Sequence, residues 1–325
     1  MASIFVCESL SAGAGAGAGA VDGDGDGDLL AAGVAMRNAI VDDLLRIDDA
    51  AVTCAVGPGP GCAAPWHGPG MRRASVSARP GEAIHDFVGR MAALHDLCWI
   101  VAPETGGELA RLHAAVGARR WIGCDAAAIA CAASKRATLA ALAAAGVPTP
   151  LDGADRHRGR WVVKPDDGAG CLSTRRVADR AAAARYLHDD ATTVQPWVEG
   201  DALSVSMIAG AGGAEAVSFN RQRIAIDADG RLADRGVEPA ALDPGTDPRV
   251  PGLRAIAAAT ARALPGLRGF VGVDVVWNAA RGPVVIEVNP RVTCAYVGLS
   301  ERLGRNLARD VLRLKLMERH HALPA

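Results

Sequence analysis

The sequence is short of net charge, of paired cysteines and of long apolar runs, and each shortage excludes a class of protein. The formal net charge of the 325 residues is −1 at pH 7. Because basic residues are not in excess, no global field favours nucleic acid or an anionic membrane surface. No stretch reaches the roughly 20 consecutive apolar residues of a membrane-spanning helix. We therefore expect neither nucleic acid nor a membrane as a partner.

Eight cysteines are present, but none stands in a Cys-x-x-Cys pair. This scatter argues against a disulfide scaffold and against a zinc module, so a reducing cytoplasm is the expected location. The N-terminal stretch is small and apolar, yet it lacks the basic start of a signal peptide and carries Glu8. We predict a first β-strand at Ala2–Cys7 instead.

The first 124 residues alternate between apolar runs and helical patterns. The strand-like runs are 2–7, 51–56 and 97–101, and the helical ones are 29–45, 82–95 and 108–116. This alternation predicts a small parallel sheet of Rossmann-like type. Because the chain has no Gly-x-Gly-x-x-Gly fingerprint there, no dinucleotide is assigned to it.

Ser11–Asp28 is a low-complexity segment in which Gly-Ala repeats run into alternating Asp and Gly. A calcium loop that starts at Asp22 would need Glu at its twelfth position, where Gly33 stands, so that interpretation fails. We predict a surface loop for the segment and leave its role open.

The most informative stretch is a predicted hairpin made of the apolar runs Phe270–Trp277 and Val284–Val288. Asp274 lies inside the first run and Glu287 inside the second, where a carboxylate is costly without a partner. With Ala279–Gly282 as the loop, the two acids face each other, and their Cβ atoms lie roughly 5 Å apart.

The same register places Asn289 on the Glu287 face, opposite Gly272. A divalent cation between Asp274 and Glu287 would relieve their repulsion, and carboxylate and amide oxygens suit Mg²⁺. We therefore predict a metal site of Asp274, Glu287 and Asn289. The alternative is a pair of ordinary strand acids that face solvent.

Two lysines upstream could balance the anion that such a metal would bridge. Ser134 is a good N-cap for a helix over Lys135–Ala145, which puts Lys135 in the first turn. Lys164 ends a predicted strand, and the turn with Gly168 and Gly170 that follows can bring backbone N–H groups to phosphates. The alternative is that both lysines are ordinary surface residues.

Taken in order, these features resemble the ATP-grasp superfamily of carboxylate–amine ligases. The resemblance rests on five motifs, namely Ser134–Thr138 with Gly146–Pro148, Val162–Pro165, Asp166–Gly170, Val194–Gly200, and Asp274 with Glu287–Arg291. Within the superfamily, the stretches 199–206, 218–222 and 269–298 look like the tyramine–glutamate ligases of methanofuran-type cofactor synthesis. The hinge departs from the superfamily by carrying Pro196 where an acidic residue is common.

The resemblance implies a fold and a reaction. The fold is an ATP-grasp fold, mixing α/β and α+β parts, with an N-terminal Rossmann-like pre-ATP-grasp domain. Its parts would be 1–124 as that domain, 125–192 as the first lobe and 193–325 as the second lobe with the metal site. The cofactors would be ATP and Mg²⁺, with Mn²⁺ as a substitute. The γ-carboxyl of L-glutamate would be phosphorylated to an acylphosphate, which tyramine or tyrosine attacks to form an amide.

The resemblance also assigns roles to single residues. Lys135, Lys164 and the Gly168–Gly170 turn would hold the phosphates. The adenine and ribose would meet Gln195, Trp197, Val198 and either Glu199 or Asp201. The alternative for Trp197 is a core residue. The transferred phosphoryl group would lie near Arg291, Arg221 and Asn220. Glu8 and Glu104 are candidates for binding an amino group of the substrates.

Three functions stay open at this point. The first is the glutamate–aromatic amine ligase, the second a ligase of the same fold with another amine, and the third a nucleotide-binding protein without turnover. The complete set of two lysines and three metal ligands argues against the third. The sequence leaves open the amine, the number of glutamates added and the oligomeric state, whether monomer or homodimer.

Overall fold

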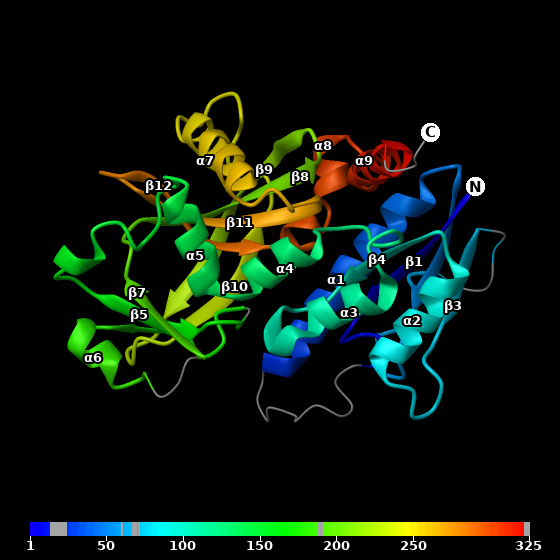
Figure 1. Cartoon of the computed structure of the whole chain (residues 1–325), viewed down its shortest axis with the longest axis horizontal. Helices are drawn as coiled ribbons and strands as arrows, with labels where there is room; N and C mark the ends of the chain where they lie inside the picture. The colour runs from blue at the N-terminus through cyan, green and yellow to red at the C-terminus, as the bar shows by residue number, and fades with distance from the viewer. Residues whose placement is uncertain are drawn as a thin grey trace. The chain divides into compact units, whose positions relative to one another are not determined.

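The computed structural model describes residues 1–13, 25–59, 61–66, 70, 72–168, 170–187 and 191–321. The chain forms two compact units (Figure 1). The N-terminal unit consists of Met1–Ala102, Glu108–Ala126 and Arg291–Ala325, and the central unit of Pro103–Gly107 and Ala127–Pro290. We describe each unit by itself. The division into 1–124, 125–192 and 193–325 stays a prediction. The residues after 290 belong to the N-terminal unit.

The N-terminal unit is built on a parallel four-stranded sheet in the order β3-β2-β1-β4. Its strands are β1 (Ala2–Glu8), β2 (Ala50–Ala55), β3 (Arg73–Val76) and β4 (Leu97–Val101). Its helices are α1 (Gly25–Leu45), α2 (Ile84–Leu94), α3 (Glu108–Val116), the 3-10 turn η4 (Cys294–Tyr296), α8 (Leu299–Leu303) and α9 (Leu307–His321). The predicted parallel sheet is confirmed by the parallel pairing of its strands, and β1 and β4 are buried over most of their length, as is typical of parallel strands.

Helix α1 starts earlier than the sequence predicts. Gly25–Asp28 belong to the helix, so the predicted surface loop is wrong for these residues. Residues 14–24 of the low-complexity segment lie outside the described residues. The error has a local cause, since alternating Gly and Asp disfavour a helix interior and only the apolar run from Leu29 onward carries a helical pattern.

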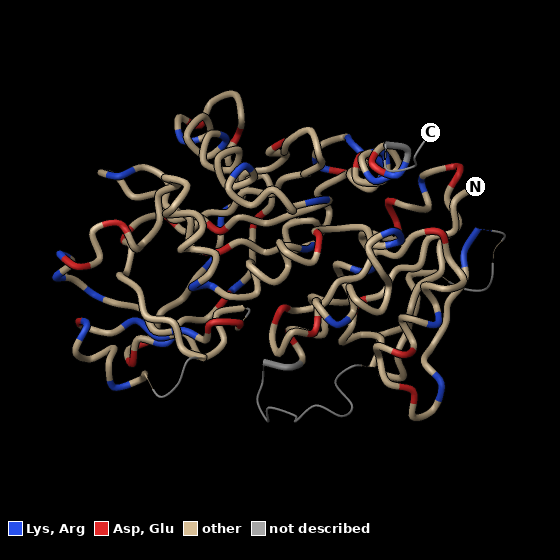
Figure 2. Tube along the Cα trace, in the orientation of Figure 1, with Lys and Arg blue, Asp and Glu red and all other residues tan. Residues whose placement is uncertain are grey.

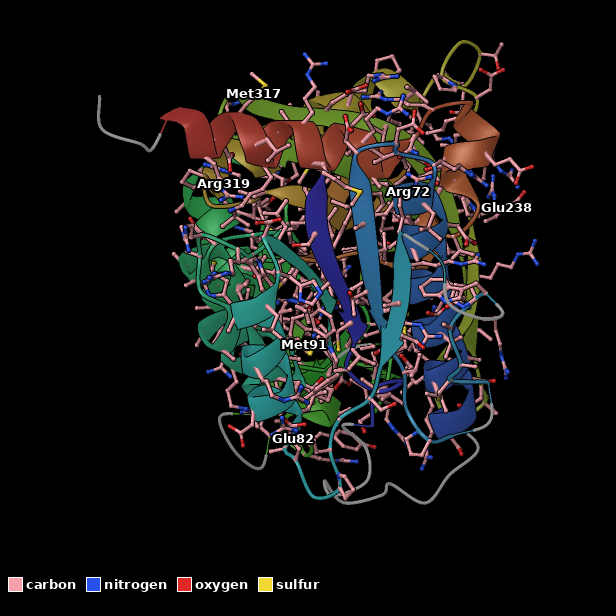
Figure 3. The ribbon with its side chains drawn as sticks, turned by 90° about the vertical axis from the view of Figure 1, so that its right-hand side faces the viewer. Arg72, Glu82, Met91, Glu238, Met317 and Arg319 are labelled. Atoms are coloured by element: carbon pink, nitrogen blue, oxygen red, sulfur yellow. The ribbon has the colours of Figure 1, made fainter. Side chains whose placement is uncertain are left out.

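The C-terminal segment packs onto α1 of the N-terminal unit. The sequence predicts one helix over Glu301–Glu318, but a left-handed residue at Gly304 separates α8 from α9. Met317 lies on the outward side of α9, whereas Met91 of α2 is buried (Figure 3). The buried carboxylate of Asp43 on α1 accepts hydrogen bonds from the hydroxyls of Tyr296, at 2.7 Å, and Ser300.

The central unit contains two antiparallel sheets. The three-stranded sheet has the order β6-β5-β7, with β5 (Trp161–Pro165), β6 (Arg175–Val177) and β7 (Thr192–Pro196). The five-stranded sheet has the order β10-β9-β8-β11-β12, with β8 (Asp201–Gly210), β9 (Gly213–Ile226), β10 (Leu232–Glu238), β11 (Gly269–Asn278) and β12 (Gly282–Asn289). The accompanying helices are η2 (Thr105–Gly107), α4 (Ala126–Ala133), α5 (Lys135–Ala144), η3 (Ala154–Arg156), α6 (Arg180–Ala184) and α7 (Val250–Ala263).

The five-stranded sheet has one apolar and one polar face. Helix α7 covers the apolar face, where the Arg254 guanidinium lies 4.9 Å from the centre of the Phe219 ring. Leu203, Val205 and Val273 share that face and are fully buried. Because side chains alternate along a strand, Ser204, Asn220, Asp274 and Glu287 share the opposite face. The polar face therefore carries the candidate site.

None of the described helices is by itself long and apolar enough to cross a membrane. Helices α4 and α5 together are long and apolar enough, but they are bent by 107° relative to each other.

Candidate functional site

Strands β11 and β12 bring the two predicted metal-ligating acids together. Asp274 pairs directly with Glu287, and Gly272 pairs with Asn289, so the predicted cross-strand register is confirmed at these positions. Gly272 has no side chain to occupy the position opposite Asn289. The three candidate metal ligands therefore share one edge of the polar face.

The hairpin loop differs from the prediction by one residue. Asn278 pairs with Gly282, so the loop is Ala279–Arg281 and not Ala279–Gly282. This change would move Glu287 out of register with Asp274 if the strands were regular. A shift between Asp274 and Val275 leaves Ile286 without a partner and restores the pairing of the acids. Such a β-bulge commonly re-aims side chains beside functional sites.

Asp274 is held in a setting that disfavours its charge. Burial, followed by repulsion from Glu287, raises the pKa of Asp274 to about 7. Its Oδ1 accepts a hydrogen bond from Gln222 Nε2 at 3.0 Å, and its Oδ2 accepts one from Asn289 Nδ2 at 3.3 Å. Gln222 was not among the predicted site residues. Its place two residues beyond Asn220 on the same strand face was the signal that could have identified it.

The two predicted phosphate-binding lysines lie near the same acids. Lys135 Nζ forms an ion pair of 3.2 Å with Glu287 Oε1 and donates to the backbone carbonyl of Gly168. Lys164 is 5% exposed. Burial lowers its pKa to about 8, with a further lowering by Lys135, while Glu287 acts against the shift. The side chain of Lys164 makes no hydrogen bond or ion pair with any described residue, so its charge is available to a ligand.

The turn after Lys164 is anchored to helix α5. Asp166 accepts hydrogen bonds from the Arg136 backbone N–H, at 2.9 Å, and from the Thr193 hydroxyl. Burial opposes ionisation, but hydrogen bonds from Ser134, Thr193 and the Arg136 N–H keep the pKa of Asp166 below its usual value. Ser134 caps α5 as predicted.

The glycines of this turn are in the positions expected of a close backbone approach. A Cβ on Gly168 would lie 3.0 Å from Pro165, and Gly170 has a φ of +66°. Ala169 lies outside the described residues, and phosphate binding by the turn stays a prediction.

Asn220 shares the polar face, but its side chain is fully engaged within the protein. It is 1% exposed and donates to the hydroxyls of Ser204 and Ser206 at 3.1 and 3.0 Å. Its Oδ1 accepts from the Ser218 hydroxyl and from the Ala240 backbone N–H. A phosphate-binding role stays a prediction and would require some of these bonds to break.

Arg221 and Asp201 lie on the other face of the sheet. Arg221 follows Asn220 on β9, so its side chain points to the opposite face, which α7 covers. The pKa of Asp247 is lowered mainly by its hydrogen bonds with Arg249 and to a smaller extent by the charge of Arg221. Asp201 forms an ion pair of 2.6 Å with Arg249 at the start of α7. The structure therefore does not bring these two residues together with Asp274 and Glu287.

Strand β7 and the residue that follows it each carry a buried polar atom without a hydrogen-bond partner among the described residues. Gln195 Oε1 and Trp197 Nε1 are buried and make no hydrogen bond with any described group. Buried polar atoms are normally paired, so an unpaired acceptor and an unpaired donor two residues apart suit a ligand that supplies their partners. The Arg176 guanidinium lies 5.4 Å from the centre of the Trp197 ring, and Val198 is buried next to it in sequence.

Three predicted residues remain, two in other segments of the chain and one, Arg291, two positions after Asn289. Glu8 ends β1 of the N-terminal unit, where burial raises its pKa and the backbone N–H groups of Leu10 and Ser11 hold its carboxylate. Glu104 is buried in the short segment Pro103–Gly107 of the central unit. Arg291 opens the C-terminal segment of the N-terminal unit. Their substrate and phosphoryl roles stay predictions.

The donor set fits a hard cation better than a soft one. Among the described residues, no group of three or more His, Cys, Asp or Glu side chains is arranged to hold a metal. The candidate site instead offers two carboxylates and one amide, all oxygen donors of the kind Mg²⁺ accepts together with phosphate oxygens and water.

Two family models match the chain. The model described as the ATP-grasp domain matches residues 132–295, and the model described as the pre ATP-grasp 3 domain matches residues 63–129. Members of the ATP-grasp family generally bind ATP with a divalent metal.

Two curated relatives carry the name tyramine–L-glutamate ligase. The protein of Methanocaldococcus jannaschii is 28% identical over 237 residues, which are 68% of this chain and 66% of the relative. That of Methanocaldococcus fervens is 29% identical over 48% of each chain. The matches thus span less than two thirds of either relative.

Solved structures share the fold at low sequence identity. An ATP-grasp superfamily protein of Archaeoglobus fulgidus superimposes with a TM-score of 0.69 at 22% identity, over 96% of this chain and 88% of that one. An L-amino acid ligase of Bacillus licheniformis gives a TM-score of 0.62 at 16% identity, over 97% and 74%. At these identities the likeness concerns the fold alone.

Proposed function

Because this chain belongs to the ATP-grasp family, we propose that it is an ATP-dependent carbon–nitrogen ligase of the acid–amine, ADP-forming class. The observation that supports the proposal is that two acids and two lysines, each a pair of like charges, lie close together in the central unit. Asp274 and Glu287 repel each other on the sheet, and Lys135 and Lys164 repel each other beside them. A metal–polyphosphate ligand supplies the cation that the acids need and the anion that the lysines need.

The metal would be held by Asp274, Glu287 and Asn289, with Gln222 orienting Asp274 through its hydrogen bond of 3.0 Å. Mg²⁺ is the natural occupant of such an oxygen set, and Mn²⁺ can replace it. When bound, the metal neutralises charge on the phosphates during transfer. Asp274 must lose its proton before it can serve as a ligand.

The nucleotide would be held by the lysines and strand β7. Lys164 and Lys135 would balance the phosphate charge, and Lys135 would then loosen its ion pair with Glu287. Gln195 Oε1 is an acceptor that suits an amino group such as that of adenine, and Trp197 Nε1 is a nearby donor. Arg221 and Asp201 are left out because they lie on the opposite sheet face.

The reaction we propose has two steps. A substrate carboxylate oxygen attacks the γ-phosphorus of ATP, ADP leaves, and an acylphosphate forms; an amine nitrogen then attacks the acyl carbon, loses a proton and expels phosphate. Attack of one anion on another needs positioning and positive charge more than an acid–base residue, which fits this lysine-rich site. Arg291 is our candidate for holding the acylphosphate.

The names of the curated relatives support L-glutamate and tyramine as the substrates. The γ-carboxyl of glutamate is the group that we propose is activated. Mass spectrometry of a reaction with ATP, Mg²⁺, glutamate and competing tyramine and tyrosine tests this. We expect γ-glutamyltyramine together with ADP and phosphate. If a panel of other amines gives product and aromatic amines give none, the ligase proposal stands and the substrate assignment fails.

Replacing Glu287 by Gln tests the metal role separately. The change keeps the size of the side chain and removes its charge, so we expect turnover to fall at least about a hundredfold while ATP binding weakens far less. Glu238→Gln, at an exposed ion pair with Arg223, is the matched control and should keep full activity. Equal losses of turnover and ATP affinity in Glu287→Gln would contradict the metal role.

A further inference from the structure

The segment Pro103–Gly107 belongs to the central unit, although the residues on both sides of it in sequence belong to the N-terminal unit. It contains the 3-10 turn η2, in which the Gly107 N–H donates to the Glu104 carbonyl at 2.9 Å. Gly106 has a φ of +61°, which a glycine adopts without strain. Thr105 and Gly106 are exposed, whereas the side chain of Glu104 is buried. These two exposed residues hydrogen-bond to another part of the central unit.

Asp167, in the turn 166–170 that follows Lys164, is the residue to which they are bonded. Its backbone carbonyl accepts a hydrogen bond from the Thr105 hydroxyl at 3.0 Å, and its carboxylate Oδ2 accepts one from the Gly106 N–H at 2.9 Å. A hydrogen bond to a carboxylate is stronger than one between neutral groups. Asp167 therefore holds two successive residues of the segment, one through its backbone and one through its side chain.

The residue after Asp167 is bonded to the candidate active site. The Gly168 carbonyl accepts a hydrogen bond from Lys135 Nζ, and the same ammonium lies 3.2 Å from Glu287 Oε1. A path of bonded neighbours thus leads from the Gly106 N–H through Asp167 and Gly168 to Lys135 and a candidate metal ligand. All of these residues belong to the central unit.

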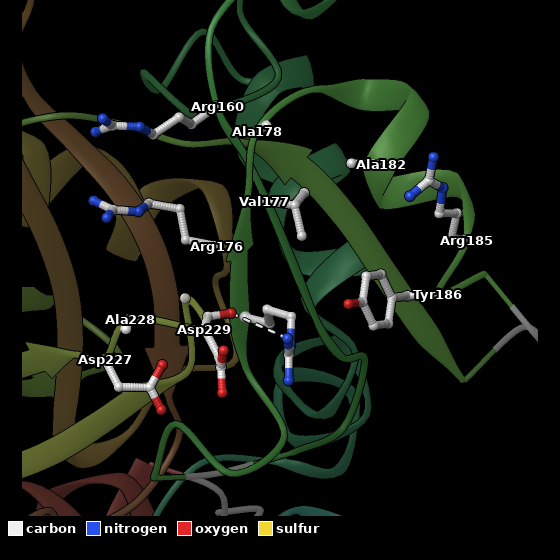
Figure 4. A pocket seen from close by; sticks show the side chains of 12 residues that line it. Arg160, Arg176, Val177, Ala178, Ala182, Arg185, Tyr186, Asp227, Ala228 and Asp229 are labelled. Carbon is white, nitrogen blue, oxygen red and sulfur yellow. Dashed lines mark hydrogen bonds between the residues drawn. The ribbon is translucent and has the colours of Figure 1, made fainter.

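The chain that leaves the turn 166–170 is held at a second place, the start of β6. Arg175 Nη1 donates to the Asp229 carbonyl at 3.0 Å (Figure 4), and the Arg176 backbone N–H donates to the Gly230 carbonyl at 2.7 Å. Both bonds fix β6 to the turn between β9 and β10. Because the exit from the turn 166–170 is fixed in this way, a ligand that orders this turn is expected to act on its entry, where Asp167 lies.

We propose that Asp167 is a positioning residue that transmits nucleotide binding at the turn 166–170 to the segment Pro103–Gly107, and with it to Glu104. The inference rests on the proposed function, since it takes the turn as the site of the nucleotide phosphates. Phosphates held by backbone N–H groups restrict the motion of the turn. The two hydrogen bonds at Asp167 extend this restriction to the segment.

The consequence for the ligase is an order of events. Glu104 is our candidate for binding an amino group of a substrate, and its segment is ordered by the nucleotide through Asp167. A ligand that binds an already ordered segment pays less conformational entropy, so nucleotide and amino substrate bind cooperatively. The acylphosphate would then form only when the second substrate can be held.

Amide hydrogen exchange of the full chain, measured by NMR with and without MgADP, tests the proposal. The probe is the Gly107 amide, because its acceptor is the Glu104 carbonyl and a change of Asp167 leaves that bond in place. In the wild type we expect saturating MgADP to slow exchange at Gly107 at least about fivefold, the lower end of usual coupling between sites. In the double variant Thr105→Val, Asp167→Ala, MgADP should still protect the amides of 164–168 but change exchange at Gly107 less than about twofold.

Asp243→Ala is the matched control. Asp243 lies in an exposed loop of the same unit, where its Oδ1 accepts the Gly245 N–H at 2.8 Å. The change removes the same kind of bond and the same charge, and it should leave the response of Gly107 to MgADP as in the wild type. Acidic and basic residues are interspersed along the chain (Figure 2), so the loss of one carboxylate disturbs no field of a single sign.

The outcomes separate this inference from the proposed function. If MgADP protects 164–168 in the wild type but not Gly107, or protects Gly107 equally in the double variant, the role of Asp167 is overturned and the nucleotide site stands. If MgADP leaves 164–168 unprotected in the wild type, nucleotide binding by the turn fails, and the inference fails with it. Slow exchange in the buried strand β8 shows that each variant is folded.

Discussion

At the scale of single residues, Asp274 links the protonation of the site to metal binding. Its carboxyl has a pKa of about 7 in the metal-free protein, because burial and Glu287 both disfavour the charge. A raised pKa means that the proton is held until the pH passes about 7. Metal binding must displace this proton, so affinity rises as the pH rises.

We predict that the affinity of the metal-free protein for Mn²⁺, measured without nucleotide by the free-ion EPR signal, rises about tenfold between pH 6 and pH 8. The factor follows because a group with a pKa of about 7 is roughly one tenth ionised at pH 6 and nine tenths at pH 8. In Asp274→Asn the affinity should be weaker and nearly independent of pH over this range. A flat profile in the wild type would contradict the assignment of Asp274 as a ligand.

Asn220 shows how burial separates a structural residue from a catalytic one. Its amide joins β8, β9 and the backbone of Ala240. We predict that Asn220→Ala lowers the free energy of unfolding by roughly 2–3 kcal/mol, because several buried hydroxyl and N–H groups lose their partner. Urea unfolding measures this loss, and activity well below the transition tests the catalytic role. A large loss of turnover with unchanged stability would support direct phosphate binding instead.

At the scale of elements, the hairpin of β11 and β12 shows which features the sequence predicts and which it does not. The alternation of apolar residues around Asp274 and Glu287 predicted both strands and the facing acids, because period two is a property of every strand. The loop length was predicted one residue too long, and the bulge at Ile286 compensated for it. A bulge is an unpaired residue with no characteristic composition, so the pattern of apolar residues does not predict it.

The face of a residue was harder to predict than its strand. Asn220 and Arg221 were both assigned to the phosphoryl group, yet adjacent strand residues point to opposite faces, and the structure turns Arg221 toward α7. Lys135 and Lys164 were identified correctly as neighbours of the acids because each lies at the end of an element, where local signals are strong. Contacts between elements, such as that of Gln222 with Asp274, depend on sheet order, which the pattern of one strand does not reveal.

The β9–β10 turn offers a test at this scale. Gly230 has a φ of +80°, and a Cβ there would lie 2.2 Å from the backbone oxygen of Arg176. We predict that Gly230→Ala detaches the turn from β6 and lowers the free energy of unfolding by roughly 2 kcal/mol, with faster hydrogen exchange at the Arg176 amide. Gly212→Ala, at the β8–β9 turn with open space around it, is the control and should change neither.

At the scale of the whole molecule, the chain closes its N-terminal unit with its last residues. The spacing of Leu303, Leu307, Val311 and Leu314 predicts one helix over Glu301–Glu318 that packs against the sheet, but an amphipathic pattern identifies only the buried face of a helix and not its partner. The structure packs α9 against α1, with Leu307 fully buried. A segment that follows the metal-site hairpin directly is thus part of the unit that begins with β1.

The packing of the C-terminal segment on α1 includes a hydrogen bond to the buried carboxylate of Asp43. The two tyrosines of the chain provide a variant and a control that test its contribution to stability. Tyr296 donates to Asp43 Oδ2 at 2.7 Å inside the N-terminal unit, whereas Tyr186 of the central unit is exposed. We predict that Tyr296→Phe lowers the free energy of unfolding of the N-terminal unit by about 1–3 kcal/mol, because Asp43 loses one of its two hydroxyl donors in a buried setting. Tyr186→Phe should leave stability within about 0.5 kcal/mol of the wild type. Hydrogen exchange read separately for the two units distinguishes a local effect from a global one. Equal stabilities of the two variants would mean that the C-terminal segment is held by the packing of α9 alone.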